Sequence, residues 1–213
     1  KADLAGADPG QEALSLPGLY STRQTGLYSL FRQARVQPDP VYAEGLTAEQ
    51  LSRYRVLYVQ NAVSMTPDEE EMLRAWVGSG GRLIATASTS IMDRWGRGRK
   101  DYGLADVFGV RYVETKTLDR AKLAAQPEVT YSGACDVVQP TTGKTALSWP
   151  EGTPAVVVND FGKGRCVFVT ARDLGLNYTS ESAGPERACF NIYKTYSPGV
   201  VAFVRGLVVK EVA

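Results

Sequence analysis

The side chains that could do chemistry in this chain are carboxylates, hydroxyls, thiols and lysine amines, because its 213 residues include no histidine. A Ser-His-Asp or Cys-His catalytic unit therefore cannot be built from this chain alone, and neither can a histidine-based zinc or iron site. Three cysteines, Cys135, Cys166 and Cys189, are widely spread and lack CxxC spacing. This pattern favours buried free thiols over a disulfide framework. We expect no bound metal and no cofactor.

A loop rich in small hydroxyl residues follows the apolar run Leu83–Ala87 and continues into a basic, glycine-bearing segment, 94–100. In open α/β sheets, ligands bind at the carboxyl ends of strands. Hydroxyl and indole groups are natural contacts for a sugar. The candidate ligand-binding residues are Thr86, Ser88, Thr89, Ser90, Asp93, Arg94 and Trp95. The competing interpretation of segment 94–100 is a solvated surface loop with Trp95 packed against the core or a partner.

No motif joins these groups into a catalytic unit. Ser88 as a nucleophile would need a lysine or a carboxylate as its base, and no sequence signal supplies one. Gly162-Lys163-Gly164 lacks the spacing of a phosphate-binding loop and the helix that should follow it, so it predicts a turn. The acidic candidates are Asp93, Asp101, Asp106, Asp160, Asp173 and Glu186. Acids in such numbers are normal on a protein surface, so we expect no catalytic residue.

Two helix–strand units in the stretch 46–93 would position the hydroxyl-rich loop. The first has Thr47 as N-cap with Gln50 closing a capping box, followed by a strand over Arg55–Gln60. The second begins at Thr66, with Pro67 at the first helical position, and leads through a glycine-rich turn to the strand over Leu83–Ala87. Helices and strands that alternate with short joints predict an α/β fold with parallel strands.

The rest of the chain completes a single predicted domain over 14–213, after a tail or linker remnant over 1–13. Before residue 46 we expect a strand at 14–20, a helix at 21–36 and a short strand at 41–43. After residue 93 we expect a helix at 101–108 with Gly109 as C-cap, strands at 111–114, 129–131, 155–159 and 165–170, and a helix at 199–209. The sheet is predicted to be mostly parallel, with a β-rich C-terminal elaboration.

Composition narrows the classes of partner. The hydrophobic share of 44% and the charged share of 22% are those of an ordinary globular protein. A net charge of +1 gives no electrostatic indication that the chain binds nucleic acid or an anionic membrane. No apolar run is long enough to span a bilayer. The chain starts at Lys1 without methionine, so we expect that upstream sequence has been removed. Bacterial-type cytoplasmic and secreted locations both remain open.

Several segments carry a resemblance to a known family: LSRYRVLYV, the helix and glycine turn LRAWVGSGGRL, the loop that ends at Asp93, and LADVFGV. Together they resemble the class I glutamine amidotransferase-like, flavodoxin-like domain in the middle of family-42 β-galactosidases, called the β-galactosidase trimerisation domain. Active amidotransferases carry a cysteine in a G-x-C-x-G elbow after the corresponding strand. Here that position reads Ala85 to Thr89, with neither cysteine nor glycine. The resemblance therefore implies a non-catalytic domain.

Three functional hypotheses follow. The first is a non-catalytic accessory domain of a β-galactosidase-like glycoside hydrolase, which assembles as a homo-oligomer (a trimer or a dimer) or acts beside an upstream glycosidase barrel, and helps to cover an active site. The second is a stand-alone module that binds a carbohydrate or another small polar molecule at the Thr86–Asp93 loop. The third is a hydrolase that uses two carboxylates about 5–9 Å apart.

Overall fold

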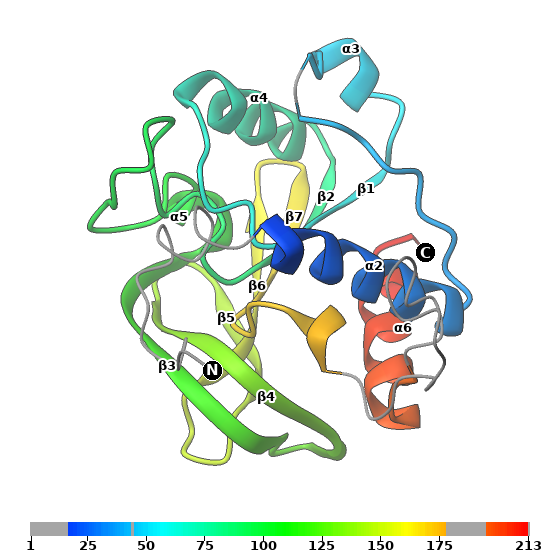
Figure 1. Cartoon of the computed structure of the whole chain (residues 1–213). Coiled ribbons are helices and arrows are strands. Elements are labelled where there is room, and N and C mark those ends of the chain that lie inside the picture. Colours follow the sequence, from blue (N-terminus) through cyan, green and yellow to red (C-terminus); the bar gives the residue numbers. More distant parts are fainter. Residues whose placement is uncertain (1–16, 44, 178–194, 213) are drawn as a thin grey trace.

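The computed structural model describes residues 17–43, 45–177 and 195–212 (Figure 1). Its helices are α2 (Pro17–Gln33), α3 (Ala48–Leu51), α4 (Pro67–Gly78), α5 (Ala105–Phe108) and α6 (Pro198–Val212), with a short 3-10 helix, η1 (Leu174–Leu176). Its strands are β1 (Val56–Val59), β2 (Arg82–Thr86), β3 (Val110–Leu123), β4 (Gln126–Pro140), β5 (Lys144–Ser148), β6 (Pro154–Phe161) and β7 (Gly164–Val169). Among the described helices, none combines the length and the apolar character that a membrane span requires.

A five-stranded sheet with the order β1-β2-β7-β6-β5 forms the centre of the fold. The pairs β1–β2 and β2–β7 are parallel, whereas β7–β6 and β6–β5 are antiparallel. The predicted α/β class is confirmed, but the sheet is mixed rather than mostly parallel. The physical reason is local, since β6 and β7 are joined by a tight turn at Gly162 that can only reverse the chain.

Helices cover both faces of this sheet (Figure 1). One face packs with α4 and α5 through a buried cluster that includes Trp76, Leu83 and Phe168. The other face packs with α2 and α6 through a second cluster that includes Phe31 and Ile84. Neighbouring residues of β2 thus point into different cores, which explains why its sequence is apolar throughout instead of alternating.

Local start and stop signals were predicted correctly. Capping boxes form at Thr47 with Gln50 and at Thr66 with Glu69, and the α4 helix has its proline in the first turn. Gly109 ends α5 in the left-handed conformation, with φ of 69°. The short β6–β7 hairpin and the final helix are also present where predicted.

Two predictions about strands were wrong. Residues 17–20 open helix α2, because a proline is tolerated in the first turn of a helix; residues 14–16 lie outside the described ranges. No strand forms at 41–43. The strands predicted at 111–114 and 129–131 are confirmed, but they are parts of the longer strands β3 and β4, which pair as one antiparallel hairpin. The strand β5 was not predicted.

Candidate functional site

The hydroxyl-rich loop leaves β2 through a tight, strained turn. Ser88 and Ser90 both adopt positive φ angles, 64° and 61°, a region that costs a non-glycine residue free energy. The loop is tied to the segment after β1, because the Ser90 N–H donates to the carbonyl of Ala62 (2.8 Å) and the Met92 N–H donates to that of Val63 (2.9 Å). The sequence therefore places Ser88 at the carboxyl edge of the sheet in a fixed conformation.

Asp136, contributed by β4, lies at the centre of this region and has no exposed surface. Its Oδ2 accepts the Ser88 N–H (2.6 Å) and the Tyr102 hydroxyl (2.8 Å), while its Oδ1 accepts the Thr115 hydroxyl (2.8 Å). The Ser88 hydroxyl lies 3.2 Å from Oδ2 and 3.3 Å from Oδ1. A buried carboxylate is tolerated only when donors surround it in this way.

The segment after β7 completes the cluster. Arg172 is 3% exposed, and its Nε donates to the Ser88 hydroxyl oxygen at 3.2 Å. Its carbonyl accepts the Thr86 hydroxyl at 2.9 Å, and the Thr86 oxygen accepts the Asn61 N–H at 2.8 Å. The adjacent Asp173 accepts the side-chain amide of Gln60 at 3.0 Å. Three strand ends are thereby joined by hydrogen bonds.

Burial fixes the protonation of the aromatic donor in this cluster. Desolvation, reinforced by the neighbouring Asp136 carboxylate, raises the pKa of Tyr102 well above its usual value. The Tyr102 hydroxyl consequently keeps its proton and remains a donor to Asp136 across the physiological range.

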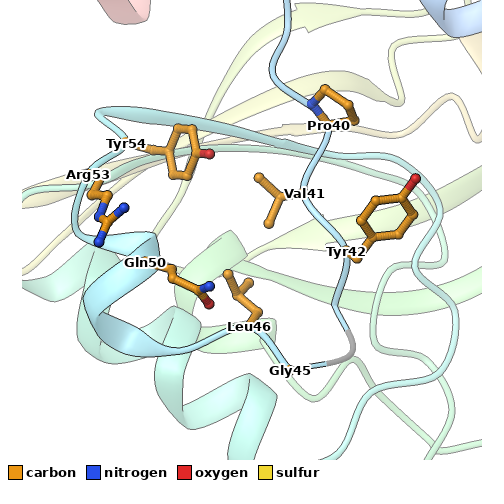
Figure 2. Close-up of a pocket in the computed structure, with 8 residues that line it drawn as sticks. All are labelled: Pro40, Val41, Tyr42, Gly45, Leu46, Gln50, Arg53 and Tyr54. Carbon is orange, nitrogen blue, oxygen red and sulfur yellow. The ribbon is translucent and has the colours of Figure 1, made fainter.

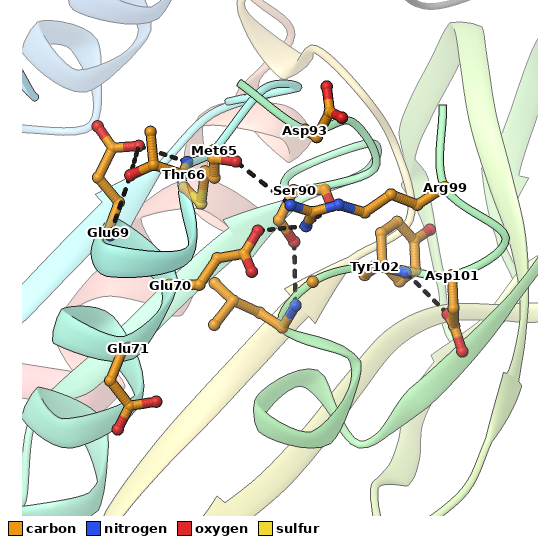
Figure 3. A network of polar contacts seen from close by, with 12 residues as sticks. Met65, Thr66, Glu69, Glu70, Glu71, Ser90, Asp93, Arg99, Asp101 and Tyr102 are labelled. Carbon is orange, nitrogen blue, oxygen red and sulfur yellow. Dashed lines mark hydrogen bonds and ion pairs between the residues drawn. The ribbon is translucent and has the colours of Figure 1, made fainter. Parts of the chain in front are cut away.

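A partly buried ion pair anchors the next part of the loop on α4 (Figure 3). The Arg99 guanidinium binds the carboxylate of Glu70, which is 8% exposed. The same guanidinium donates to the carbonyls of Ser90 (3.3 Å) and Met65 (3.4 Å). The Gly103 N–H donates to the Ser90 carbonyl at 2.9 Å, so both ends of segment 90–103 are held against the helix.

Between these anchors the chain forms an exposed turn, which we call the basic tip (residues 94–97). Asp93 organises it, since one carboxylate oxygen accepts the N–H groups of Trp95 (2.8 Å) and Arg97 (2.9 Å). The hydrogen bond from Arg97 is the largest of the effects that lower the pKa of Asp93. Trp95 is 72% exposed, and the Arg94 guanidinium carbon lies 4.9 Å from the centre of its ring.

The predicted ligand-binding residues thus divide into two groups. Thr86, Ser88, Thr89 and Ser90 are each at most 1% exposed, and Thr86 and Ser88 take part in the hydrogen-bonded cluster around Asp136 and Arg172. Asp93, Arg94 and Trp95 lie outside it, at the base and in the turn of the basic tip. Segment 94–97 is therefore a surface loop, and Trp95 is exposed instead of packing against the core of its own chain. A ligand role for either group remains a prediction.

The predicted acidic candidates do not form a pair in the described contacts. Asp101 accepts the N–H groups of Tyr102 and Tyr112, both at 2.9 Å. Asp106 binds Arg74 and Asp160 binds Arg165. Glu186 and the third cysteine, Cys189, lie outside the described residues. Within the described ranges, no group of three or more histidine, cysteine, aspartate or glutamate side chains could hold a metal ion. The other two cysteines, Cys135 and Cys166, are buried free thiols, as predicted.

Sequence reasoning missed the residues at the centre of the cluster: Tyr102, Thr115, Asp136 and Arg172. One signal was available for Asp136, because it is a lone acid within the apolar run Cys135–Val138. A charged side chain in such a strand is buried only with partners. Those partners come from segments far away in sequence, so the sequence pattern alone could not name them.

A shallow pocket of about 350 Å³ lies elsewhere, beside α3 (Figure 2). The residues that line it are Pro40, Val41, Tyr42, Gly45, Leu46, Gln50, Arg53 and Tyr54. The Gln50 side chain is already used in the capping box, and the Tyr54 hydroxyl donates to Asp39 at 2.6 Å. The pocket is separate from the carboxyl edge of the sheet.

The fold and the cluster define a three-layer α/β domain whose strand ends are closed by a buried polar network. The family model of the β-galactosidase trimerisation domain matches residues 15–180. The chain belongs to this family. No curated protein matches it.

Solved structures agree on the fold. The β-galactosidase of Bacillus circulans sp. alkalophilus matches with a TM-score of 0.65 and 18% identity, over 91% of this chain and 27% of that one. The β-galactosidase of the haloarchaeon Halorubrum lacusprofundi matches with a TM-score of 0.62 and 15% identity, over 91% and 27%. A cytoplasmic protein of Salmonella typhimurium, STM3548, matches with a TM-score of 0.58 and 15% identity, over 87% and 85%. This chain therefore spans about a quarter of the length of the β-galactosidases it matches.

Proposed function

We propose that this chain is a non-catalytic assembly module that brings copies of itself together, as a trimer, within or beside a glycoside hydrolase. The observation that carries the proposal is the match of residues 15–180 to a family described by trimerisation. The likeness to two β-galactosidases, each much longer than this chain, supports a neighbouring catalytic domain. In that setting the module would also help to cover the active site of an adjacent subunit.

The contacts and the burial of Ser88 support a non-catalytic role. We propose that Ser88 lies in the sharp turn where an amidotransferase-like fold carries its nucleophile, because it comes two residues after the end of β2 and adopts the positive φ of such a turn. Its hydroxyl is engaged by Asp136 and Arg172, and the residue is 1% exposed. A substrate carbonyl would have no room to reach the oxygen, and Asp136 is already occupied by other donors.

Self-association can be tested by co-expressing two copies of the chain that carry different affinity tags. We expect each tag to recover the other copy at the ratio of a mixed trimer. Recovery of each tag alone would contradict the proposal. In the same preparation we expect no turnover of a chromogenic β-galactoside and no hydrolysis of glutamine, since no catalytic unit is available.

A further inference from the structure

The pocket beside α3 has two walls that the sequence holds together (Figure 2). One wall is the segment 40–46, and the other is α3 with the turn that follows it, up to Tyr54. The Tyr54 hydroxyl donates to Asp39 at 2.6 Å, so the start of the first wall is tied to the end of the second. The capping box of Thr47 and Gln50 fixes the beginning of α3. A ligand would therefore lose little free energy in organising the pocket.

Apolar side chains and two tyrosines line this pocket. Val41 and Leu46 are half-buried, and the rings of Tyr42 and Tyr54 flank Val41 in Figure 2. Tyr42 is 82% exposed, so one large aromatic ring faces solvent at the pocket. Such a ring packs against the C–H face of a ligand and keeps its hydroxyl for a hydrogen bond.

Polar groups of the pocket have hydrogen-bonding capacity left. Gln50 uses its side-chain oxygen in the capping box, and no described residue accepts a hydrogen bond from its amide nitrogen. The Arg53 guanidinium forms a loose ion pair with Glu49 at 3.5 Å, and the two side chains are 70% and 84% exposed. A pair of this kind contributes little in water, so the guanidinium can turn to a ligand at small cost.

These groups match a neutral sugar better than an anion. The hydroxyls of a pyranose ring can accept hydrogen bonds from the Gln50 amide and the Arg53 guanidinium and can donate to the adjacent Asp39 carboxylate. A phosphate would be attracted by Arg53 but repelled by Asp39 and Glu49. The volume of about 350 Å³ lies at the lower end of ligand pockets, which span roughly 300 to 1,000 Å³, and suits a small saccharide.

We propose that this pocket binds a neutral saccharide, with Tyr42 as the stacking platform and with Gln50 and Arg53 as hydrogen-bond donors to its hydroxyls. The site goes beyond the assembly function proposed above and does not depend on it, because every lining residue belongs to one chain. It also places saccharide binding away from the Thr86–Asp93 loop, whose hydroxyl residues are buried.

Titration of the isotope-labelled full chain, followed by NMR, can test the site. The probes are methyl β-galactoside, methyl β-glucoside and lactose, and we expect at least one to shift the side-chain amide signals of Gln50 in a saturable way. Tyr42→Ala should weaken this binding about tenfold, whereas Tyr42→Phe keeps the ring and should retain most of the affinity. Tyr28→Ala is the matched control, since Tyr28 is also exposed (51%) but does not line the pocket.

Two further measurements test the polar contacts. Arg53→Ala should weaken saccharide binding several-fold, because it removes a donor from an exposed position without touching the core. The phosphate ester of galactose should bind more weakly than methyl β-galactoside, because Asp39 and Glu49 oppose its charge. Circular dichroism and thermal unfolding establish that the variants fold as the parent does.

Failure of the site can be told apart from failure of the assembly function, because the oligomeric state does not enter the titration. The inference is overturned if none of the three saccharides gives a saturable shift, or if Tyr42→Ala and Arg53→Ala leave binding unchanged. If Trp95→Ala abolishes binding and Tyr42→Ala does not, the saccharide contacts the basic tip and the inference fails. It also fails if a polyproline peptide shifts the Gln50 signals and no saccharide does, since the pocket is then a peptide site.

Discussion

Asp136 shows how a single residue can close the carboxyl edge of an α/β sheet. Its carboxylate accepts two hydroxyl groups and one backbone N–H at 2.6 to 2.8 Å and also lies beside the Ser88 hydroxyl. These donors, all from described residues, are neutral groups, and the Arg172 Nε donates to the Ser88 hydroxyl that lies beside the carboxylate. Asp136, the carboxylate closest to the Ser88 hydroxyl among the contacts above, therefore has a structural role: it joins the loop after β2 to β3 and β4.

Replacing this carboxylate tests its structural role. Asp136→Asn keeps the size of the side chain but turns an acceptor into a donor that faces other donors. We expect it to lower the free energy of unfolding by about 2 to 4 kcal/mol. Asp160→Asn is the control, because Asp160 is exposed and forms a surface ion pair with Arg165, and it should cost less than about 1 kcal/mol. Urea unfolding measures both; equal effects would contradict the account.

Gly103 is a second residue whose identity the site dictates. A Cβ there would lie 2.1 Å from Glu70 Oε1 and 2.2 Å from an Arg99 nitrogen, so Gly103→Ala must displace the ion pair that anchors the tip. We expect a loss of about 1 to 3 kcal/mol in urea unfolding. At Gly98 an added Cβ meets nothing within 4 Å, so Gly98→Ala should be close to neutral. Similar losses in the two variants would show that the ion pair is unimportant.

At the scale of the residue, the sequence predicted which loop follows the strand but not which distant side chains contact it. Thr86 and Ser88 were placed at a strand end from local pattern, and they are there. Asp136 is 48 residues from Ser88 and Arg172 is 84 residues from it. Contacts of such separation depend on how the β3–β4 hairpin folds back, which no local pattern encodes.

Elements whose ends are fixed by nearby residues were the most predictable. The capping boxes at Thr47 and Thr66 need only a partner three residues later. By contrast, the order of strands in the sheet is decided by packing between distant segments. The mixed sheet and the strand β5 were not predicted for this reason, and the strand expected at 14–20 was wrong because helix α2 begins at Pro17.

The N-cap of α4 offers a test at the scale of an element. Thr66 accepts the Glu69 N–H at 3.2 Å, and its own N–H donates to the Glu69 carboxylate at 2.7 Å. Thr66→Ala should lower the free energy of unfolding by about 0.5 to 2 kcal/mol, whereas Thr66→Ser keeps the hydroxyl and should recover most of it. If the two variants are equally unstable in thermal unfolding, the hydroxyl is not the source of the effect.

For the molecule as a whole, the buried thiols make the free energy of unfolding fall at alkaline pH. Burial raises the pKa of Cys135 from its usual 9.0 to about 11, and it also raises that of Cys166. Because the folded state holds these protons more tightly than the unfolded state, their contribution is complete below pH 9.0 and is lost as the pH rises towards about 11. Urea unfolding across this range should show a decline of at least about 2 kcal/mol, and a flat profile would contradict the assignment.

Assembly is the property on which the account depends most. Light scattering of the untagged chain over a concentration series measures it directly. We predict that the mass rises from that of the 23.1 kDa chain to about three times this value and then stays constant. A mass of 23.1 kDa at every concentration would contradict the proposal that these residues form an assembly module.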